Sequence, residues 1–275
     1  MKRIVAAVLC LVFATGVLSA QTMPRVPRVS QGAMVKQIVG LSDVSVAYHR
    51  PGVKGRPIWG NVVKYGEPWR AGANEPTLIT FSDDAMIGGK KLAAGTYRIV
   101  VFPAEKGDWT FIFNSEVKNW GTMYEAKYDT LKLAVKPETV PMTEWMTFSF
   151  EDPTPTSVKL ALTWEKVRLT VPIEFNTLAK VQASLGNWQL LASAARFAVD
   201  NDLYTGEAMG WADRSIALDR NPRNLQVKAE LLAKSGKIAD AIALGEEAVK
   251  LAKAKDANAN TSQLDGLIAG WKAKK

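Results

Sequence analysis

The hydrophobic pattern of this chain changes abruptly near Asn176, and this change constrains the fold more than any other feature. Before it, apolar and polar residues alternate in short runs such as 44–48, which is typical of half-buried strands. After it, Leu178, Val181 and Leu185 recur at helical spacing and alanine becomes dense. The sequence therefore predicts an α+β multidomain protein, with a β domain over 31–175 and an all-α region over 176–275.

The β domain is predicted to be an antiparallel β-sandwich of about eight or nine strands. Strand-like runs occur at 44–48, 77–81, 96–102, 109–113, 130–135, 145–150, 158–164 and 167–173. Residues that favour turns separate these runs, as at Gly88-Gly89-Lys90, and no periodic segment of helical length lies among them. Aromatic residues that alternate within the runs, namely Trp145, Phe148 and Trp164, are predicted to lie in the core.

The helical region carries a faint repeat with an offset of about 33 residues, close to the tetratricopeptide period of about 34. The matched positions are Ala208, Ser215 and Leu218 with Ala241, Ala248 and Leu251. Small residues let paired helices approach closely, and the leucines are expected to fill the seam. We therefore predict about five or six helices in tetratricopeptide-like hairpins, with an unrelated helical bundle as the alternative.

The N-terminus has the pattern of a cleavable signal peptide. Lys2 and Arg3 precede an apolar run over 4–18, which is too short to span a membrane as a helix. We expect cleavage near Ala20, then a flexible leader over 21–30, and a periplasmic or extracellular protein with no membrane span after cleavage. A retained membrane anchor is the alternative.

Composition excludes several kinds of site. Cys10 is the only cysteine and His49 the only histidine, so the chain after cleavage has no zinc site built on several of these ligands. The sequence has neither a Gly-x-Ser-x-Gly elbow nor a phosphate-binding Gly-x-x-x-x-Gly-Lys loop, and no cofactor is predicted. The formal net charge of +8 falls by two when Lys2 and Arg3 leave. Because the lysines are spread thinly, we predict no nucleic-acid partner.

One long segment between two predicted strands is the candidate functional site. It extends from Tyr48 to Glu75, is interrupted by glycines and prolines, and contains three arginines, two tryptophans and the only histidine. The arginine guanidinium suits carboxylate, phosphate or sulfate groups, and tryptophan faces suit sugar rings or cations. The predicted ligand-binding residues are Arg50, Arg56, Trp59, Trp69, Arg70, Asn74 and Glu75.

This segment also carries a family resemblance. Arg50-Pro51, Gly55-Arg56, Ile58-Trp59-Gly60 and the run Trp69-Arg70-Ala71-Gly72-Ala73-Asn74-Glu75 resemble the signature of domain-of-unknown-function family 2911, found in exported bacterial proteins. The resemblance continues through 89–97, 109–114, 120–121 and 148–152, and covers about 30–175. It implies export, a β-rich domain and, in longer members, a helical tail like this one. It implies no activity, and His49 stands where the family would have serine.

Three functions remain open for this segment. In a binding module, Arg56 and Arg70 hold a small anionic or polyhydroxylated, glycan-like ligand, and the helical tail binds a protein partner. In an envelope hydrolase acting on a glycan or ester, Glu75 or His49 is the general base. In a structural or assembly protein, the arginines pair with loop carboxylates such as Glu67 and with backbone carbonyls, above tryptophans that fill the core. We favour the binding module, without enzymatic activity.

Overall fold

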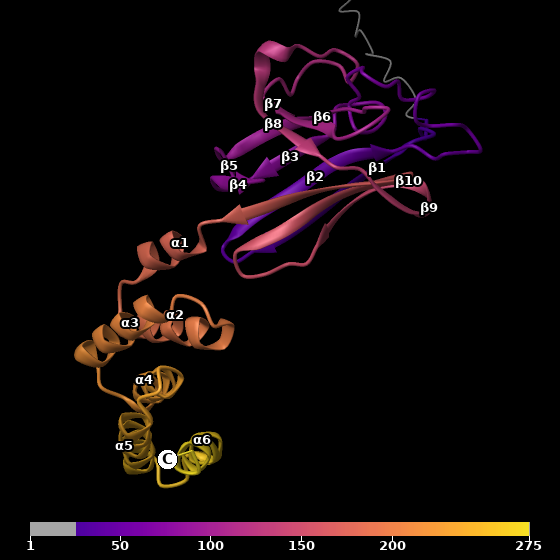
Figure 1. The fold of residues 1–275 in the computed structure, drawn as a ribbon. Helices are drawn as coiled ribbons and strands as arrows, with labels where there is room; N and C mark the ends of the chain where they lie inside the picture. The colour runs from indigo at the N-terminus through magenta and orange to yellow at the C-terminus, as the bar shows by residue number, and fades with distance from the viewer. Residues whose placement is uncertain (1–25, 275) are drawn as a thin grey trace, which may run out of the picture.

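The computed structural model describes residues 26–274, so the predicted signal peptide and the first part of the predicted leader lie outside the described residues. Within 26–274 the chain forms two antiparallel sheets of ten strands in total, followed by six helices (Figure 1). The predicted α+β class with a helical tail is confirmed. In Figure 1 the helices extend away from the β domain as a curved arm.

The β domain contains one sheet of six strands and one of four. The first sheet has the order β1 (Gln31–Val39), β2 (Ser42–Arg50), β3 (Leu78–Phe81), β6 (Gly95–Phe102), β7 (Trp109–Asn114) and β8 (Asp129–Val135). The second has the order β5 (Lys90–Leu92), β4 (Ala85–Ile87), β10 (Ser157–Phe175) and β9 (Glu138–Glu151). A short 3₁₀ helix, η1 (Ala126–Tyr128), precedes β8.

The two sheets enclose one hydrophobic core, to which alternate residues of the strands contribute. Tyr97, Ile99 and Val101 of β6 all face this core, as the alternation predicts. The opposite face of β6 is covered as well, because Arg98 is only 2% exposed. The segment 115–128 supplies that cover, and the Arg98 guanidinium donates to two of its backbone carbonyls.

A buried carboxylate anchors the segment 115–128. Asp129 accepts hydrogen bonds from Tyr124 Oη at 2.6 Å and Asn114 Nδ2 at 2.7 Å, and lies 2.8 Å from Lys132 Nζ. Burial raises the pKa of the Asp129 carboxyl, but the hydrogen bonds from Lys132, Tyr124 and Asn114 outweigh burial and hold the pKa below its ordinary value. The charged form of Asp129 therefore stabilises this side of the sheet.

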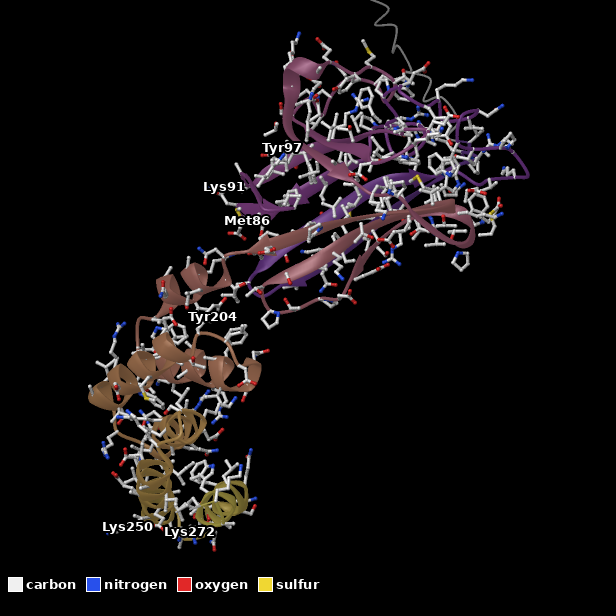
Figure 2. The ribbon with its side chains drawn as sticks, viewed as in Figure 1. Met86, Lys91, Tyr97, Tyr204, Lys250 and Lys272 are labelled. Atoms are coloured by element: carbon white, nitrogen blue, oxygen red, sulfur yellow. The ribbon has the colours of Figure 1, made fainter. Side chains whose placement is uncertain are left out.

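Three details of the strand prediction are wrong. The two runs at 158–164 and 167–173 are one strand, β10, which continues through a β-bulge where Glu165 has φ 55°. Trp145 is 44% exposed on β9 rather than buried. Strands β4 and β5 were missed because three residues are too few to show a period, and β1 because this edge strand exposes Met34. Figure 2 shows Met86 of β4 and Lys91 of β5 at the surface of this hairpin.

The tail consists of α1 (Thr177–Ser184), α2 (Trp188–Asn201), α3 (Thr205–Leu218), α4 (Pro222–Lys234), α5 (Ile238–Lys255) and α6 (Ser262–Lys272). Asn176 caps α1, since its side chain accepts from Ala179 N at 3.0 Å. Pro222 begins α4 behind an Asn221 capping box.

The repeat positions are only partly as predicted. The small residues Ala208, Ser215, Ala241 and Ala248 are all fully buried between helices. Leu218, however, is 63% exposed, so the prediction that it fills a seam is wrong. It lies at the last position of α3. The tetratricopeptide assignment of the tail stays a prediction.

Candidate functional site

The long loop between β2 and β3, residues 51–77, ties the two sheets together at one end of the sandwich. Its first part joins β9, where Gly52 bridges Trp145 and Pro51 O accepts from Met146 N at 3.0 Å. Its second part joins β6, where Trp69 and Val101 exchange two backbone hydrogen bonds of 2.8 Å. The loop has no strand or helix of its own, but these two anchors fix its backbone. Its side chains are therefore held in defined positions.

Four tryptophans pack beneath this loop. Trp59 makes edge contacts with Trp69, Trp109 and Trp164 at ring-centre distances of 5.6, 4.8 and 5.8 Å. Trp69 and Trp164 are stacked at 5.8 Å. Trp69 and Trp164 are buried and Trp59 is partly buried against the same core. This tryptophan cluster supports the loop from below. Its aromatic contacts stabilise the fold by more than the burial of apolar area alone.

Arg50 and Arg56 are held by backbone carbonyls. Arg50 Nε donates to Met146 O of β9 at 3.0 Å. Arg56 Nε donates to Val53 O at 3.0 Å and its Nη2 to Gly52 O at 2.6 Å. Neither guanidinium forms an ion pair within residues 26–274. Both side chains therefore stabilise the loop, as expected for a structural role. They do so through hydrogen bonds to the chain and not through ion pairs with loop carboxylates.

Arg70 differs from the other two arginines. It is partly buried, its Nε is buried without a hydrogen-bond partner, and it forms no ion pair within the described residues. Its side chain packs on Gly121, where an added Cβ would lie 2.6 Å from Arg70 Cδ. Burial lowers the pKa of Arg70, and the nearby Arg98 is a like charge. Arg70 is thus a cation whose counter-ion is not supplied by residues 26–274.

Asn74 and Glu75 bind the chain that leads into β1. Asn74 Nδ2 donates to Ser30 O at 3.1 Å, and Arg28 Nη1 lies 2.5 Å from both carboxylate oxygens of Glu75. His49 Nε2 is 3.3 Å from Glu75 Oε2. A backbone hydrogen bond at Glu75 itself, with Arg28 and His49, lowers the pKa of its carboxyl. A lowered pKa makes Glu75 a weaker base, which disfavours it as a general base at neutral pH.

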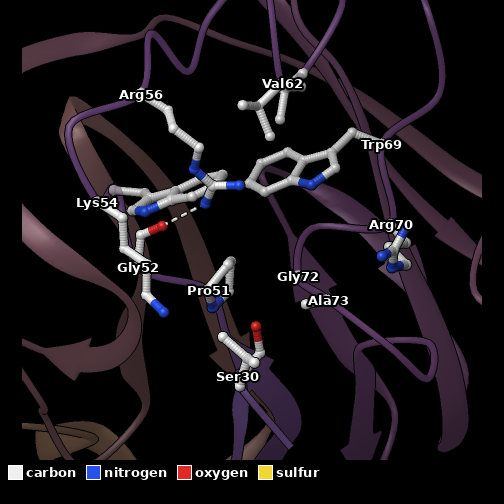
Figure 3. A pocket seen from close by; sticks show the side chains of 13 residues that line it. Ser30, Pro51, Gly52, Lys54, Arg56, Val62, Trp69, Arg70, Gly72 and Ala73 are labelled. Atoms are coloured by element: carbon white, nitrogen blue, oxygen red, sulfur yellow. Dashed lines mark hydrogen bonds between the residues drawn. The ribbon is translucent and has the colours of Figure 1, made fainter.

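A cavity of about 360 Å³ opens beside the loop. Its lining is Val29, Ser30, Pro51, Gly52, Lys54, Arg56, Val62, Val63, Trp69, Arg70, Gly72, Ala73 and Trp164. In Figure 3, Arg56, Val62 and Trp69 lie on one side of it and Ser30 on the opposite side, with Arg70 at the edge. The volume is within the range of small-molecule sites, near its lower end.

Of the seven predicted residues, Arg56, Trp69 and Arg70 line this cavity. Arg50, Trp59, Asn74 and Glu75 do not line it, and they support the loop from beneath or behind. Sequence reasoning missed Lys54, which lines the cavity, and Arg98, which is buried next to Arg70. Nothing in the strand pattern of β6 marks Arg98, because the segment that covers it lies more than twenty residues away in sequence.

The loop and nearly all of the cavity lining lie within a region that matches a known protein family. A family model described as "Protein of unknown function (DUF2911)" matches residues 30–173, which is more than half of the chain. The chain belongs to this family. The DUF2911 region covers nearly the whole β domain, including the loop, the tryptophan cluster and the cavity. No curated protein and no solved structure matches the chain significantly.

Two further observations concern the described part of the chain. None of its helices is long and apolar enough to cross a membrane. Across the same residues no three His, Cys, Asp or Glu side chains are grouped closely enough to hold a metal ion.

Proposed function

We propose that this DUF2911 protein is an exported binding module whose ligand occupies the cavity beside the loop. The ligand is a small molecule with an anionic group and, on its other face, hydroxyl groups or a sugar ring. The helical tail is proposed to bind a protein partner through its surface. Export, to the periplasm or the cell exterior, rests on the signal-peptide pattern of the first twenty residues.

One observation carries the proposal for the cavity: the Arg70 guanidinium reaches it without a carboxylate partner among residues 26–274. A half-buried cation without a counter-ion costs free energy, and a bound carboxylate, phosphate or sulfate would remove that cost. Arg56 adds a second cation at the same cavity, and the edge of Trp69 adds an aromatic surface. A charged group in a cavity whose pKa is shifted by burial is a candidate for a functional site.

A purely structural role for the loop is the second candidate, because Arg50 and Arg56 both donate hydrogen bonds to backbone carbonyls. That role explains two arginines and leaves Arg70 without an explanation. The hydrolase has no comparable support, since the carboxylate predicted as its base is paired with Arg28.

The test is a thermal-shift screen of the purified protein against inorganic phosphate, sulfate, citrate, gluconate, glucuronate, galacturonate and neutral hexoses. A ligand at about 100 times its Kd stabilises the native state by about 2.7 kcal/mol, which such a screen detects. Arg70→Met keeps the aliphatic packing on Gly121 and removes the charge. We expect it to abolish the shift produced by the anionic hit.

The matched control is Arg214→Met, which removes an exposed arginine from α3 in the tail. This variant should respond to the hit as the unmodified protein does. An anion whose stabilisation is equally strong in Arg70→Met would bind elsewhere, and the proposal for this cavity would then be wrong.

A further inference from the structure

A second cavity lies on the other side of Arg70. It has a volume of about 330 Å³, and its lining includes Lys64, Glu67, Gly121 and Thr122. It shares four lining residues with the first cavity, namely Val62, Val63, Trp69 and Arg70. Because these four residues line both, the two cavities adjoin each other at the loop and Arg70 borders both; the pair is called the groove below.

The charged residues that line the groove are mostly cations. Lys54 and Arg56 line the first cavity, Lys64 lines the second, and Arg70 lines both. Glu67, in the second cavity, is the one carboxylate among the lining residues. A row of separated positive charges suits a ligand that repeats its negative charge along its length, and a single small anion would leave the outer cations unused.

Two exposed aromatic residues are next in sequence to residues that line the second cavity. Trp120 precedes the lining residue Gly121 in the chain and is 53% exposed. Tyr65 follows Lys64 and packs one part of its ring on Gly60, while 38% of the residue remains exposed. Exposed indole and phenol rings are surfaces on which sugar rings can stack.

We propose that the two cavities form one extended site for a linear acidic glycan, with the carboxylates of successive uronic-acid units bound along the row from Arg56 through Arg70 to Lys64. This inference rests on the proposed function and names its ligand class. The combined volume is then that of a mid-sized ligand site, in place of two sites near the lower limit.

An acidic peptide fits the groove less well. Extended peptides generally bind by adding a strand to a free sheet edge, so that main-chain hydrogen bonds provide the affinity. Here the lining comes from loop residues, with Trp164 of β10 as the one contribution from a strand, and the residues on either side of Trp164 are paired with β9. Recognition must therefore come from cationic and aromatic side chains, which is the chemistry of an acidic sugar.

The experiment is calorimetric titration of the purified protein with galacturonic acid and with its dimer and tetramer. We expect the tetramer to bind at least about tenfold more tightly than the monomer, and a neutral tetramer of glucose to bind at least about tenfold more weakly than the acidic one. Lys64→Gln should weaken tetramer binding about five- to tenfold and leave monomer binding unchanged. Arg70→Met should weaken both.

The control is Lys253→Gln, an exposed lysine of α5 in the tail, which should change neither affinity. Equal affinity for monomer and tetramer would overturn the extended site while leaving the single cavity of the proposed function intact. Tighter binding of tetraglutamate than of tetragalacturonate would overturn the glycan as the ligand class. Failure of every glycan here while phosphate, sulfate or citrate still binds through Arg70 would overturn this inference alone, and failure of all of these anions overturns the proposed function too.

Discussion

Arg70→Met is expected to leave the protein as stable as before or to stabilise it. The substitution removes a charge with no hydrogen bond or ion pair within residues 26–274, and the methionine side chain can still pack on Gly121. It also removes the repulsion between Arg70 and Arg98. Because Arg70 still reaches solvent through the two cavities, we expect a gain between zero and about 1 kcal/mol.

Arg98→Met is the informative contrast, since Arg98 lies beside Arg70 and has the opposite relation to its surroundings. Its guanidinium donates to the carbonyls of Gly121 and Met123, so its loss leaves two acceptors without a partner. Each unsatisfied buried group costs about 1–3 kcal/mol. We expect a loss of about 2 kcal/mol, and not the full cost of two buried groups, because Met123 is exposed and water can reach its carbonyl.

The assay is thermal unfolding of both variants beside the unmodified protein, without ligand. For a protein of this size, about 1 kcal/mol shifts Tm by about 2–4 °C. Arg70→Met should therefore raise Tm by no more than about 4 °C, and Arg98→Met should lower it by about 4–8 °C or more. If Arg70→Met lowers Tm as much as Arg98→Met does, Arg70 stabilises the fold, and the argument for a ligand at Arg70 fails.

Three further changes probe the fold. Asp129→Asn should reduce the fall in Tm that the protein shows on acidification. The pKa of Asp129 is lowered, so its stabilising charge is present above about pH 4 and is lost as the pH falls further. An unchanged dependence of Tm on pH in the variant would contradict this. Trp145→Ala should cost less than about 1 kcal/mol and Trp164→Ala about 3–5 kcal/mol in denaturant unfolding, since the first is 44% and the second 2% exposed; similar costs would be inconsistent with the observed burial. Gly121→Ala should lower Tm by several degrees, because the new methyl would lie 2.3 Å from a backbone oxygen of the segment 70–74. An unchanged Tm would show that the backbone there moves aside at little cost.

Much of the fold could be predicted from the sequence because neighbouring residues determine most of its strands and helix ends. β2 and β7 bury alternate residues against one core, and the cap at Asn176 needs only the next three residues. The errors arose where distant segments decide the outcome. Alternation places Trp145 in a strand but cannot say which face that strand buries, and nothing local joins the two halves of β10 through the bulge at Glu165.

The candidate site was predictable as a place and only partly as a set of residues. Glycines, prolines and arginines locate the loop, but the partners of each arginine come from other parts of the chain. Arg50 is satisfied by β9, almost a hundred residues away, and Glu75 by Arg28 in the predicted leader. One sequence therefore cannot distinguish an arginine that supports the loop from one that faces a cavity, because the residue types are the same.

Four positions of the motif Trp69 to Glu75 have a clear structural reason, and Arg70 has none. Trp69 pairs with β6 and stacks in the tryptophan cluster, and Gly72 is required because a Cβ there would lie 2.7 Å from a threonine hydroxyl oxygen. Asn74 adopts φ 57° and binds a backbone carbonyl, and Glu75 binds an arginine. Arg70 has no comparable contact within residues 26–274, although its Nε is buried. A buried polar atom without a hydrogen-bond partner calls for an explanation in a natural protein, and a ligand at Arg70 provides one.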